Sequence, residues 1–196
     1  MTRRSRAEMM ATTRAKLLTT ARHVFATQGY AHASMDDITA RAGLTRGALY
    51  HHFGGKEGLL IGVVEQIEAE VGERLQRVSE AAPTPWESFR RRCRTYLELA
   101  LEQEIRRIIL QDARAVLGDV PKEAQSVAIA ALQASLDRLI QEGIMAPLHS
   151  GVLAQMIYGA ITEASFWIAE PDSDIETRLA QALGSLDRLL DGLKLA

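Results

Sequence analysis

The sequence predicts an all-α protein of about nine helices, and three observations support this prediction. Apolar residues recur at spacings of three and four along nearly the whole chain. No segment of the sequence shows the alternation of period two that is typical of strands. Aromatic residues make up only 5% of the chain and prolines number five, while alanine and leucine are frequent, which favours helices over sheets.

Length and composition set broad limits on the kind of protein. The 196 residues can form one large domain or two small ones, either with a substantial core. With 47% hydrophobic and 24% charged residues, the composition is that of an ordinary soluble globular protein. Cys93 is the single cysteine, so an internal disulfide is impossible and no oxidising compartment is required.

Two segments bear on the location of the protein. The first ten residues begin like a signal peptide, but no apolar run of sufficient length follows them, so a cytoplasmic location is expected. Residues 152–169 form the most apolar segment, but Gln155, Thr162 and Glu163 lie within it and no basic residue flanks it closely. We therefore expect no membrane span.

Charge is unevenly distributed along the chain. Residues 1–56 hold nine basic and three acidic side chains, a net charge of +6, whereas the remainder carries −8. A basic first quarter on an acidic body predicts a nucleic-acid-binding head joined to a module with another role. The alternative is a chance clustering of solvated charges.

Glycines and capping residues define the first two helices. The first helix is expected to end at Gly29, where a left-handed residue is favoured. Ser34 caps the second helix, with Asp37 as the acidic half of a capping box, and Gly43 ends it after about two turns. The expected inner residues are Leu17, Ala21, Val24 and Phe25 in the first helix, and Ile38 and Ala42 in the second.

The third and fourth helices differ in length. Thr45 is expected to cap a short helix over 46–52 that breaks at Gly54 and Gly55. A much longer helix then runs over 56–78 with a continuous apolar stripe. The inner residues are Leu49 and Phe53 in the short helix, and Leu60, Val63, Val64, Ile67, Val71, Leu75 and Val78 in the long one.

The later helices are marked by strong start signals. Thr84 and Pro85 combine a cap with proline at the first helical position, and residues 173–176 form a capping box before the last helix. The segment 145–150 lacks helical spacing and is expected to be a connector. The five later helices are expected at 85–102, 104–117, 121–143, 151–169 and from 174 to the C-terminus.

The first three helices have the pattern of a helix-turn-helix. Two short helices meet at a turn containing Gly43, and a longer helix precedes them. One face of the second short helix must be free to enter the DNA major groove while the other is held by the scaffold. Leu49 and Phe53 supply the held face. Gly47 leaves little bulk on the free face, and Arg46 has the planar fork that bonds guanine.

Residues 12–60 resemble the DNA-binding region of the tetracycline-repressor (TetR) family of transcriptional regulators. The remainder resembles the family in helix number and rough length, and two of its segments, 113–119 and 159–171, are similar to the regulatory domains of one branch. The matching head positions are Ala21, Phe25, Gly29, Tyr30, Ser34, Ile38, Ala42, Gly43, Gly47, Tyr50, His52, Phe53, Lys56, Leu59 and Leu60.

The resemblance implies roles for individual residues. Tyr50 and His52 would donate to phosphates, and Lys56 would add its charge to the N-terminal dipole of the long helix. Arg46 is expected to read a base, whereas Thr45 is either a cap alone or also a phosphate donor. The candidate DNA-binding residues are Ser34, Thr45, Arg46, Gly47, Ala48, Tyr50, His51, His52 and Lys56.

The sequence departs from the family pattern at two places. His51 stands where the family varies, so its contact with DNA is left open. Gly54 and Gly55 replace the polar cap often found before the lysine, which leaves backbone NH groups to bind phosphate or water. The first residues, 2–6, are expected to be a solvated tail rather than an arm that follows the DNA.

Other functions of the adjacent histidines are less favoured. His51 and His52 point roughly 100° apart on a helix and no cysteine lies near them, so no metal site is expected. A general base would need a nucleophile or a substrate cleft, and this segment supplies neither. A structural role for His52, bonded to an adjacent helix, is an alternative that is compatible with DNA binding.

The last two helices predict a homodimer. A helix-turn-helix reads only a few base pairs, so adequate specificity usually requires two copies. Helix 151–169 is rich in small residues and helix 174–196 has an apolar stripe, so four such helices from two subunits could form a bundle. The alternative is that both apolar stripes are buried within one subunit. The small residues are Ala154, Gly159, Ala160 and Ala164.

The fourth to eighth helices could enclose a pocket for an unidentified small-molecule effector, although each candidate residue also fits a role in the core. Glu163 is acidic within an apolar helix, and would serve a cationic or hydrogen-bonding ligand or a bond across the dimer seam. The candidate lining residues are Phe89, Cys93, Tyr96, Met156, Tyr158, Glu163, Phe166 and Trp167.

The expected function is that of a ligand-responsive repressor with no cofactor and no enzymatic activity. Residues 1–58 would form the DNA-binding domain, and 59–196 the ligand-binding and dimerisation domain. Two heads about 34–36 Å apart would bind a palindromic operator, and a ligand would move them out of register through the shared helix. The alternative is a small helical lipid-binding or ligand-binding protein, or an enzyme, with an incidental basic N-terminus, which no catalytic motif supports.

Overall fold

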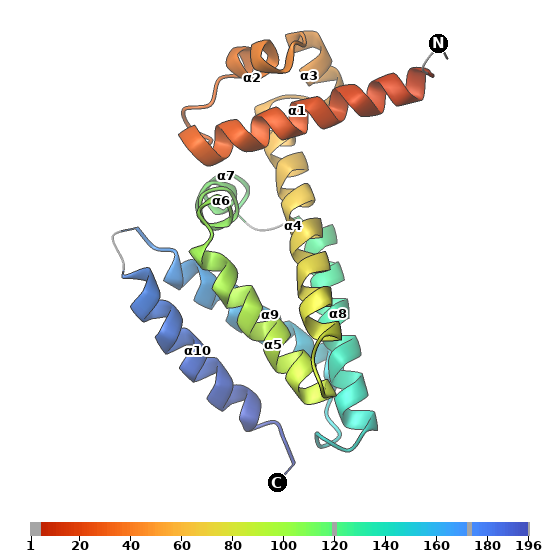
Figure 1. Ribbon diagram of the computed structural model, residues 1–196, viewed down its shortest axis with the longest axis vertical. Helices are drawn as coiled ribbons and strands as arrows, with labels where there is room; N and C mark the ends of the chain where they lie inside the picture. Colours follow the sequence, from red (N-terminus) through yellow and green to blue (C-terminus); the bar gives the residue numbers. More distant parts are fainter. Residues whose placement is uncertain (1–4, 119–120, 172–173, 196) are drawn as a thin grey trace. The chain divides into compact units, whose positions relative to one another are not determined.

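The computed structural model describes residues 5–118, 121–171 and 174–195 (Figure 1). Within these ranges the chain is helical and contains no strand, and an isolated bridge joins Met145 to Lys194. When short 3-10 and π segments are counted with the helices they continue, the described chain has nine helices. The predicted all-α class is therefore confirmed. No helix in these ranges is both long and apolar enough to cross a membrane.

The chain forms two compact units. The first contains the residues up to Ile67 together with the segment that starts at Arg107, and the second contains Glu68–Arg106 and the residues from Pro121 onward. Helix α4 (Lys56–Glu80) thus begins in the first unit and continues in the second. A functional boundary after residue 58 stays a prediction.

The first unit is built around α1, the longest of its own helices. A complete capping box starts α1, because the Glu8 amide donates to Ser5 Oγ at 3.2 Å and the Ser5 amide donates to Glu8 Oε2 at 2.7 Å. The apolar residues predicted to face inward are buried, including Leu17, Phe25 and Ile38. The unit's other elements are α2 (Met35–Ala42), α3 (Arg46–Phe53), η2 (Arg106–Ala113, a π-helix) and α7 (Arg114–Leu117), and α1 spans Arg6–Gln28.

Two of the predicted helix ends in the first unit differ from expectation. Gly29 has a positive φ of 78° but an extended ψ of 159°, so it is not left-handed helical. Ser34 caps α2 by accepting from the Asp36 amide at 3.2 Å, and the predicted capping box with Asp37 is wrong. The Asp37 carboxylate instead pairs with Arg41, one turn further along the same helix, at 2.9 Å.

The second unit is a bundle in which α9 packs against α5, α8 and α10 (Figure 1). Helix α5 also contacts α8 and α10 and therefore lies at the centre of this unit. In addition to the later part of α4, this unit contains α5 (Pro85–Glu98), η1 (Leu99–Leu101), α6 (Gln103–Ile105), α8 (Lys122–Gln141), α9 (Ser150–Ile168) and α10 (Ile175–Asp191).

Capping residues start two of these helices, and the cap of α5 is the one that the sequence predicts. Thr84 Oγ1 accepts from the Glu87 amide at 3.2 Å, and Pro85 occupies the first position of α5. Asp174 caps α10 by accepting from the Thr177 amide at 3.2 Å. Ser173, predicted to begin that capping box, lies outside the described residues.

Helices α5 and α10 are joined by ion pairs. The Arg90 Nε atom lies 2.9 Å from Asp187 Oδ1, and Arg94 pairs with the other carboxylate oxygen. The hydrogen bond from Arg90 and the charge of Arg94 hold the pKa of Asp187 below its usual range, although partial burial opposes them. This carboxylate links two helices that are about 90 residues apart in the sequence.

Candidate nucleic-acid interface

Helix α3 is held by one face and exposes the other. Thr45 Oγ1 accepts from the Ala48 amide at 3.2 Å and caps the helix, as predicted. Leu49 is fully buried. The half-buried ring of Phe53 lies 5.3 Å from the Arg14 guanidinium carbon, so α1 covers it with a cation. These contacts fix the helix and leave its opposite face to solvent.

The exposed face carries most of the predicted DNA-binding residues. Tyr50 is 48% exposed, although aromatic side chains are usually covered. Ala48 and His52 are half-buried, so their contribution to this face is partial. The exposed members of the predicted set are Ser34, Thr45, Arg46, Gly47, Tyr50 and His51.

Arg46 has a partner that the sequence did not reveal. Its Nε atom lies 3.3 Å from Asp36 Oδ1, and its Nη1 donates to Asp36 Oδ2 at 3.4 Å. Both side chains are more than half exposed, and such pairs contribute at most about 1 kcal/mol. A guanine edge or a phosphate can therefore replace Asp36 at low cost. Sequence periodicity could not find this pair because its members lie on different helices.

Lys56 lies at the start of α4 against the end of α1. Its Nζ atom is 4.4 Å from the centre of the Tyr30 ring and donates to the Ala31 carbonyl oxygen at 3.4 Å. Burial lowers the pKa of Lys56, and Asp112 opposes this effect. A cation at a helix N-terminus is repelled by the helix dipole, so an arriving phosphate would relieve that repulsion.

Gly54 and Gly55 begin α4 through backbone groups alone. Gly54 is left-handed helical, with φ 71° and ψ −8°, and Gly55 has φ 147°. The Gly55 carbonyl oxygen accepts the first hydrogen bond of α4, from the Leu59 amide at 3.1 Å. Residues that carry a side chain rarely adopt the positive φ angles of these two glycines. This explains why no polar capping residue occupies this position.

Two further glycines let α4 approach α3 and α1 closely. A Cβ atom on Gly58 would lie 1.9 Å from the Phe53 carbonyl oxygen, and one on Gly62 would lie 3.0 Å from Leu18 Cδ2. No side chain fits at Gly58 unless the backbone moves. Sequence reasoning did not single out these residues, although two glycines four positions apart in a helix are a signal of close packing.

The segment after Arg107 holds the C-terminal end of α1. The Tyr30 amide donates to Asp112 Oδ2 at 2.8 Å, and Arg107 Nε lies 3.4 Å from the same oxygen. The Arg107 guanidinium also covers Gly29, where an added Cβ would be 1.8 Å from Nη2. This contact joins residues more than 80 positions apart, so local sequence patterns did not reveal it.

The adjacent histidines contact each other edge to face. The rings of His51 and His52 are 5.3 Å apart at 69°. Among the residues that the structure describes, no group of three histidine, cysteine or acidic side chains is arranged to hold a metal ion. His52 also lies 6.2 Å from the Phe53 ring, which is compatible with the structural role considered for it.

The residues predicted to line a ligand pocket differ in burial, and three of the eight are exposed. Met156 is 67% exposed and Trp167 is 37% exposed, and Glu163 is also exposed on α9. Helical spacing identified α9 as apolar but could not tell which apolar side faces inward. The other candidates are buried (Phe89, Cys93 and Tyr158) or half-buried (Tyr96 and Phe166), and a ligand role for all eight stays a prediction.

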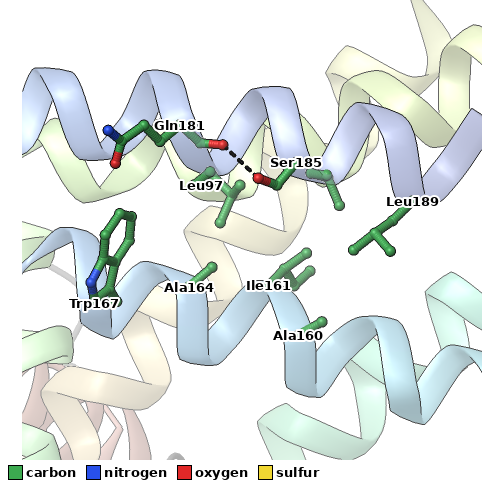
Figure 2. A pocket seen from close by; sticks show the side chains of 10 residues that line it. Leu97, Ala160, Ile161, Ala164, Trp167, Gln181, Ser185 and Leu189 are labelled. Carbon is green, nitrogen blue, oxygen red and sulfur yellow. Dashed lines mark hydrogen bonds between the residues drawn. The ribbon is translucent and has the colours of Figure 1, made fainter.

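A groove of about 380 Å³ lies between α9 and α10 (Figure 2). Trp167 stands at one end of it, and Leu189 lies at the other end of the labelled set (Figure 2). Ser185 Oγ donates to the Gln181 carbonyl oxygen at 2.9 Å, so the hydrogen of this hydroxyl is already bonded within α10. The lining residues are Leu97, Ala160, Ile161, Ala164, Trp167, Gln181, Ala182, Ser185, Leu186 and Leu189.

Two family models match separate parts of the chain. Residues 17–63 match the model described as bacterial regulatory proteins, tetR family. Residues 86–193 match the tetracyclin repressor-like C-terminal domain, which alone covers more than half of the chain. The first match includes all of α2 and α3, and the second includes all of α8, α9 and α10 and α5 except Pro85.

Individual relatives agree with these models. A crystal structure of a TetR-family transcriptional regulator from Pectobacterium atrosepticum is 55% identical, with a TM-score of 0.92 over 98% of this chain and 99% of that one. The transposon Tn10 TetC protein of Escherichia coli is 26% identical over 73% of each chain. The regulator AcrR of Shigella flexneri is 32% identical over 50% of this chain and 46% of its own.

Proposed function

The chain belongs to the tetracycline-repressor family of transcriptional regulators, and from this premise we propose that it is a ligand-responsive repressor that binds a palindromic operator as a homodimer. It is a regulator rather than an enzyme. The observation that carries the proposal is the exposed face of α3, whose opposite side is anchored by the fully buried Leu49.

DNA binding follows from the chemistry of that face. Arg46 offers a planar fork that only an exposed, weak ion pair occupies. Gly47 leaves room for close approach to a base pair. Tyr50 supplies an exposed side chain with a hydroxyl group, and Lys56 supplies a positive charge at the start of the next helix. These two groups could bind two successive phosphates of a DNA strand.

The outward sides of α9 and α10 support a homodimer. Val152 and Leu189 are 53% and 67% exposed, and Met156 on α9 is exposed to a similar degree. Together with the groove between the two helices, these residues form an apolar surface that a second subunit would cover. Two copies would place two α3 helices about one turn of DNA apart.

The proposed ligand response uses α4. A small molecule bound within the second unit would favour one position of the later part of α4, and the earlier part carries Lys56 and the contact between Gly58 and α3. The ligand would shift the population toward a form in which the two heads no longer match successive major grooves.

Selection of bound sequences from a random DNA pool tests the proposal. We expect a palindrome, and affinity for random DNA that falls steeply with salt because several phosphates are neutralised. Arg46→Ala should relax specificity at one base position by roughly 1–3 kcal/mol, whereas Lys56→Ala should weaken binding to all sequences about equally. Arg41→Ala on α2 is the control, because its charge pairs with Asp37.

Three results would each contradict part of the proposal. If the affinity for DNA did not depend on salt concentration, residues 1–58 would not neutralise phosphates as proposed. Equal losses on every sequence for Arg46→Ala and Lys56→Ala would show that Arg46 binds phosphate only. Recovery of single half-sites without a palindrome would contradict the dimer and leave the assignment of α3 intact.

A further inference from the structure

Helix α5 contains a buried arginine with no partner. Arg92 is 7% exposed, and it forms no hydrogen bond or ion pair with any residue of the described ranges. Its neighbours differ, because Arg90 and Arg94 pair with Asp187, and Arg91 pairs with Glu87 at 3.5 Å. Within the described chain, Arg92 is the one charged side chain that is buried.

A lone guanidinium is costly to bury because it cannot become neutral. Burial lowers the pKa of Arg92, but arginine remains protonated in proteins, so the charge stays. Glu68 on α4 shows the contrast. Burial raises the pKa of its carboxyl group to about 7, so this group can take up a proton instead of requiring a partner. Arg92 therefore keeps its charge and would be stabilised by an anion, whereas the Glu68 carboxyl group can become neutral.

Two buried residues lie close to Arg92 in the sequence of α5. Phe89 lies one turn before it on α5, and both Phe89 and Cys93 are buried. Burial raises the pKa of the Cys93 thiol to about 12, so the thiol is neutral and does not balance the arginine. A ligand that reached Arg92 would have to bring an apolar body together with its charge.

A second unsatisfied group lies on the helix that packs against α5. Thr162 on α9 is 9% exposed, and its Oγ1 atom is buried with no hydrogen-bond partner within the described residues. Leu97 of α5 and Ile161 of α9 meet at the groove that faces α10. Around the axis of α5, Arg92 points roughly 140° away from Leu97, and around the axis of α9, Thr162 points roughly 100° away from Ile161. Neither Arg92 nor Thr162 lines the groove. The described part of the second unit thus holds a largely covered arginine without a protein partner and a buried free hydroxyl.

We propose that Arg92 binds the carboxylate group of a small apolar effector inside the second unit. The planar fork of arginine matches a carboxylate through two parallel hydrogen bonds. One buried positive charge balances one negative charge, which favours a monocarboxylate over a phosphate dianion. The inference rests on the proposed ligand response and specifies its chemical class.

Matched acids and amides test this inference on the full-length protein. Octanoate and benzoate should bind in calorimetry and raise the melting temperature, whereas octanamide and benzamide, which have the same shape without the charge, should not. In Arg92→Met the affinity for the acids should fall roughly 10-fold to 100-fold, because hydrogen bonds to a charged group are lost. Arg91→Met, which removes an exposed arginine beside it, should bind like the wild type.

Binding of neither acid to the wild type, binding of acids and amides alike, or undiminished binding of acids to Arg92→Met would overturn the proposal. Stability supplies a readout that needs no ligand. Methionine keeps much of the volume of arginine and removes the charge. The urea concentration at the unfolding midpoint of Arg92→Met should therefore equal or exceed that of the wild type. A clearly lower midpoint would mean that Arg92 is already satisfied in the folded protein.

Operator binding, measured in parallel, separates this inference from the proposed function. Release of the operator by the acids but not the amides would support both. Binding of the acids through Arg92 without any change in operator affinity would keep the site and overturn the ligand response. Release of the operator by amides alone would keep the ligand response and overturn the anion site.

Discussion

Two helical glycines of the first compact unit are crowded, whereas two of the second have open surroundings. In the first unit, a side chain on Gly58 would collide with the backbone of α3, and one on Gly62 would press on Leu18. In the second unit, Gly159 of α9 and Gly184 of α10 have nothing within 4 Å of where a Cβ would be, and both are exposed. The first unit thus uses small residues to bring its own helices together, whereas the second presents them at its surface.

The difference shows where each unit obtains its packing. Close contact between α3 and α4 fixes α3, the helix proposed to read DNA, from within one chain. The surface of α9 and α10 also exposes Met156 and Leu189, and it fits the proposed dimer. A change in a glycine of the first unit should therefore alter folding, and a change on the α9 surface should alter assembly.

The largest expected effect comes from a charge on the α9 surface. Met156→Lys should leave the isolated subunit folded, because the residue is 67% exposed. In the proposed dimer the lysine would be buried without a partner, at a cost of at least about 3 kcal/mol. Analytical ultracentrifugation should show dissociation at concentrations at which the wild type is dimeric.

Val127→Lys is the control for this change. Val127 is 71% exposed on α8, outside α9 and α10, so its substitution should leave assembly unchanged. Equal dimerisation of Met156→Lys and the wild type would move the dimer interface elsewhere. It would also remove the contrast drawn between the two units.

A smaller effect is expected at the contact between α3 and α4. Gly58→Ala places a methyl group against the Phe53 carbonyl oxygen and should destabilise the protein by roughly 1–3 kcal/mol in urea unfolding. Operator affinity should fall as well, because Phe53 ends the reading helix.

Gly72→Ala on the same helix should have the opposite sign. No atom lies within 4 Å of the Cβ position at Gly72, so alanine should stabilise the helix by roughly 0.5–1 kcal/mol. If both substitutions stabilised the protein to the same extent, the close approach at Gly58 would be refuted.

The smallest effect concerns the ion pairs that hold α10 to α5. Since the folded-state pKa of Asp187 is depressed, its contribution is complete above the unfolded value of about 4 and is lost as the pH falls through the folded value. Asp187→Asn should cost about 1 kcal/mol at pH 7, and this difference from the wild type should shrink toward pH 3 in urea unfolding. A difference that does not depend on pH would show that the charge of Asp187 is unimportant.

Much of the fold could be predicted because its signals are local. Apolar spacing placed nine helices, and threonine caps placed the starts of α3 and α5. The exposed face of α3 was predictable because Leu49 and Gly47 occupy opposite sides of one short helix. These signals depend on residues within about one turn of each other.

The remainder depends on contacts between distant residues. Asp36 could not be assigned to Arg46, or Asp112 to the Tyr30 amide, from spacing within a helix. The apolar face of α9 was predicted, but Met156 was assigned to a pocket rather than to the surface because both sides of this helix are apolar. Asp37 was assigned to a cap, but the favourable pair with Arg41 one turn away prevails.

Burial of the single cysteine has a practical consequence for spectroscopy. Cys93 is inaccessible and its thiol has a pKa of about 12, so maleimide and methanethiosulfonate reagents should not modify it in the folded protein. A cysteine introduced at the exposed His51 would then be the one reactive thiol of each chain, without prior removal of Cys93. Spin labels there would report the distance between two reading helices directly, with and without an added carboxylate.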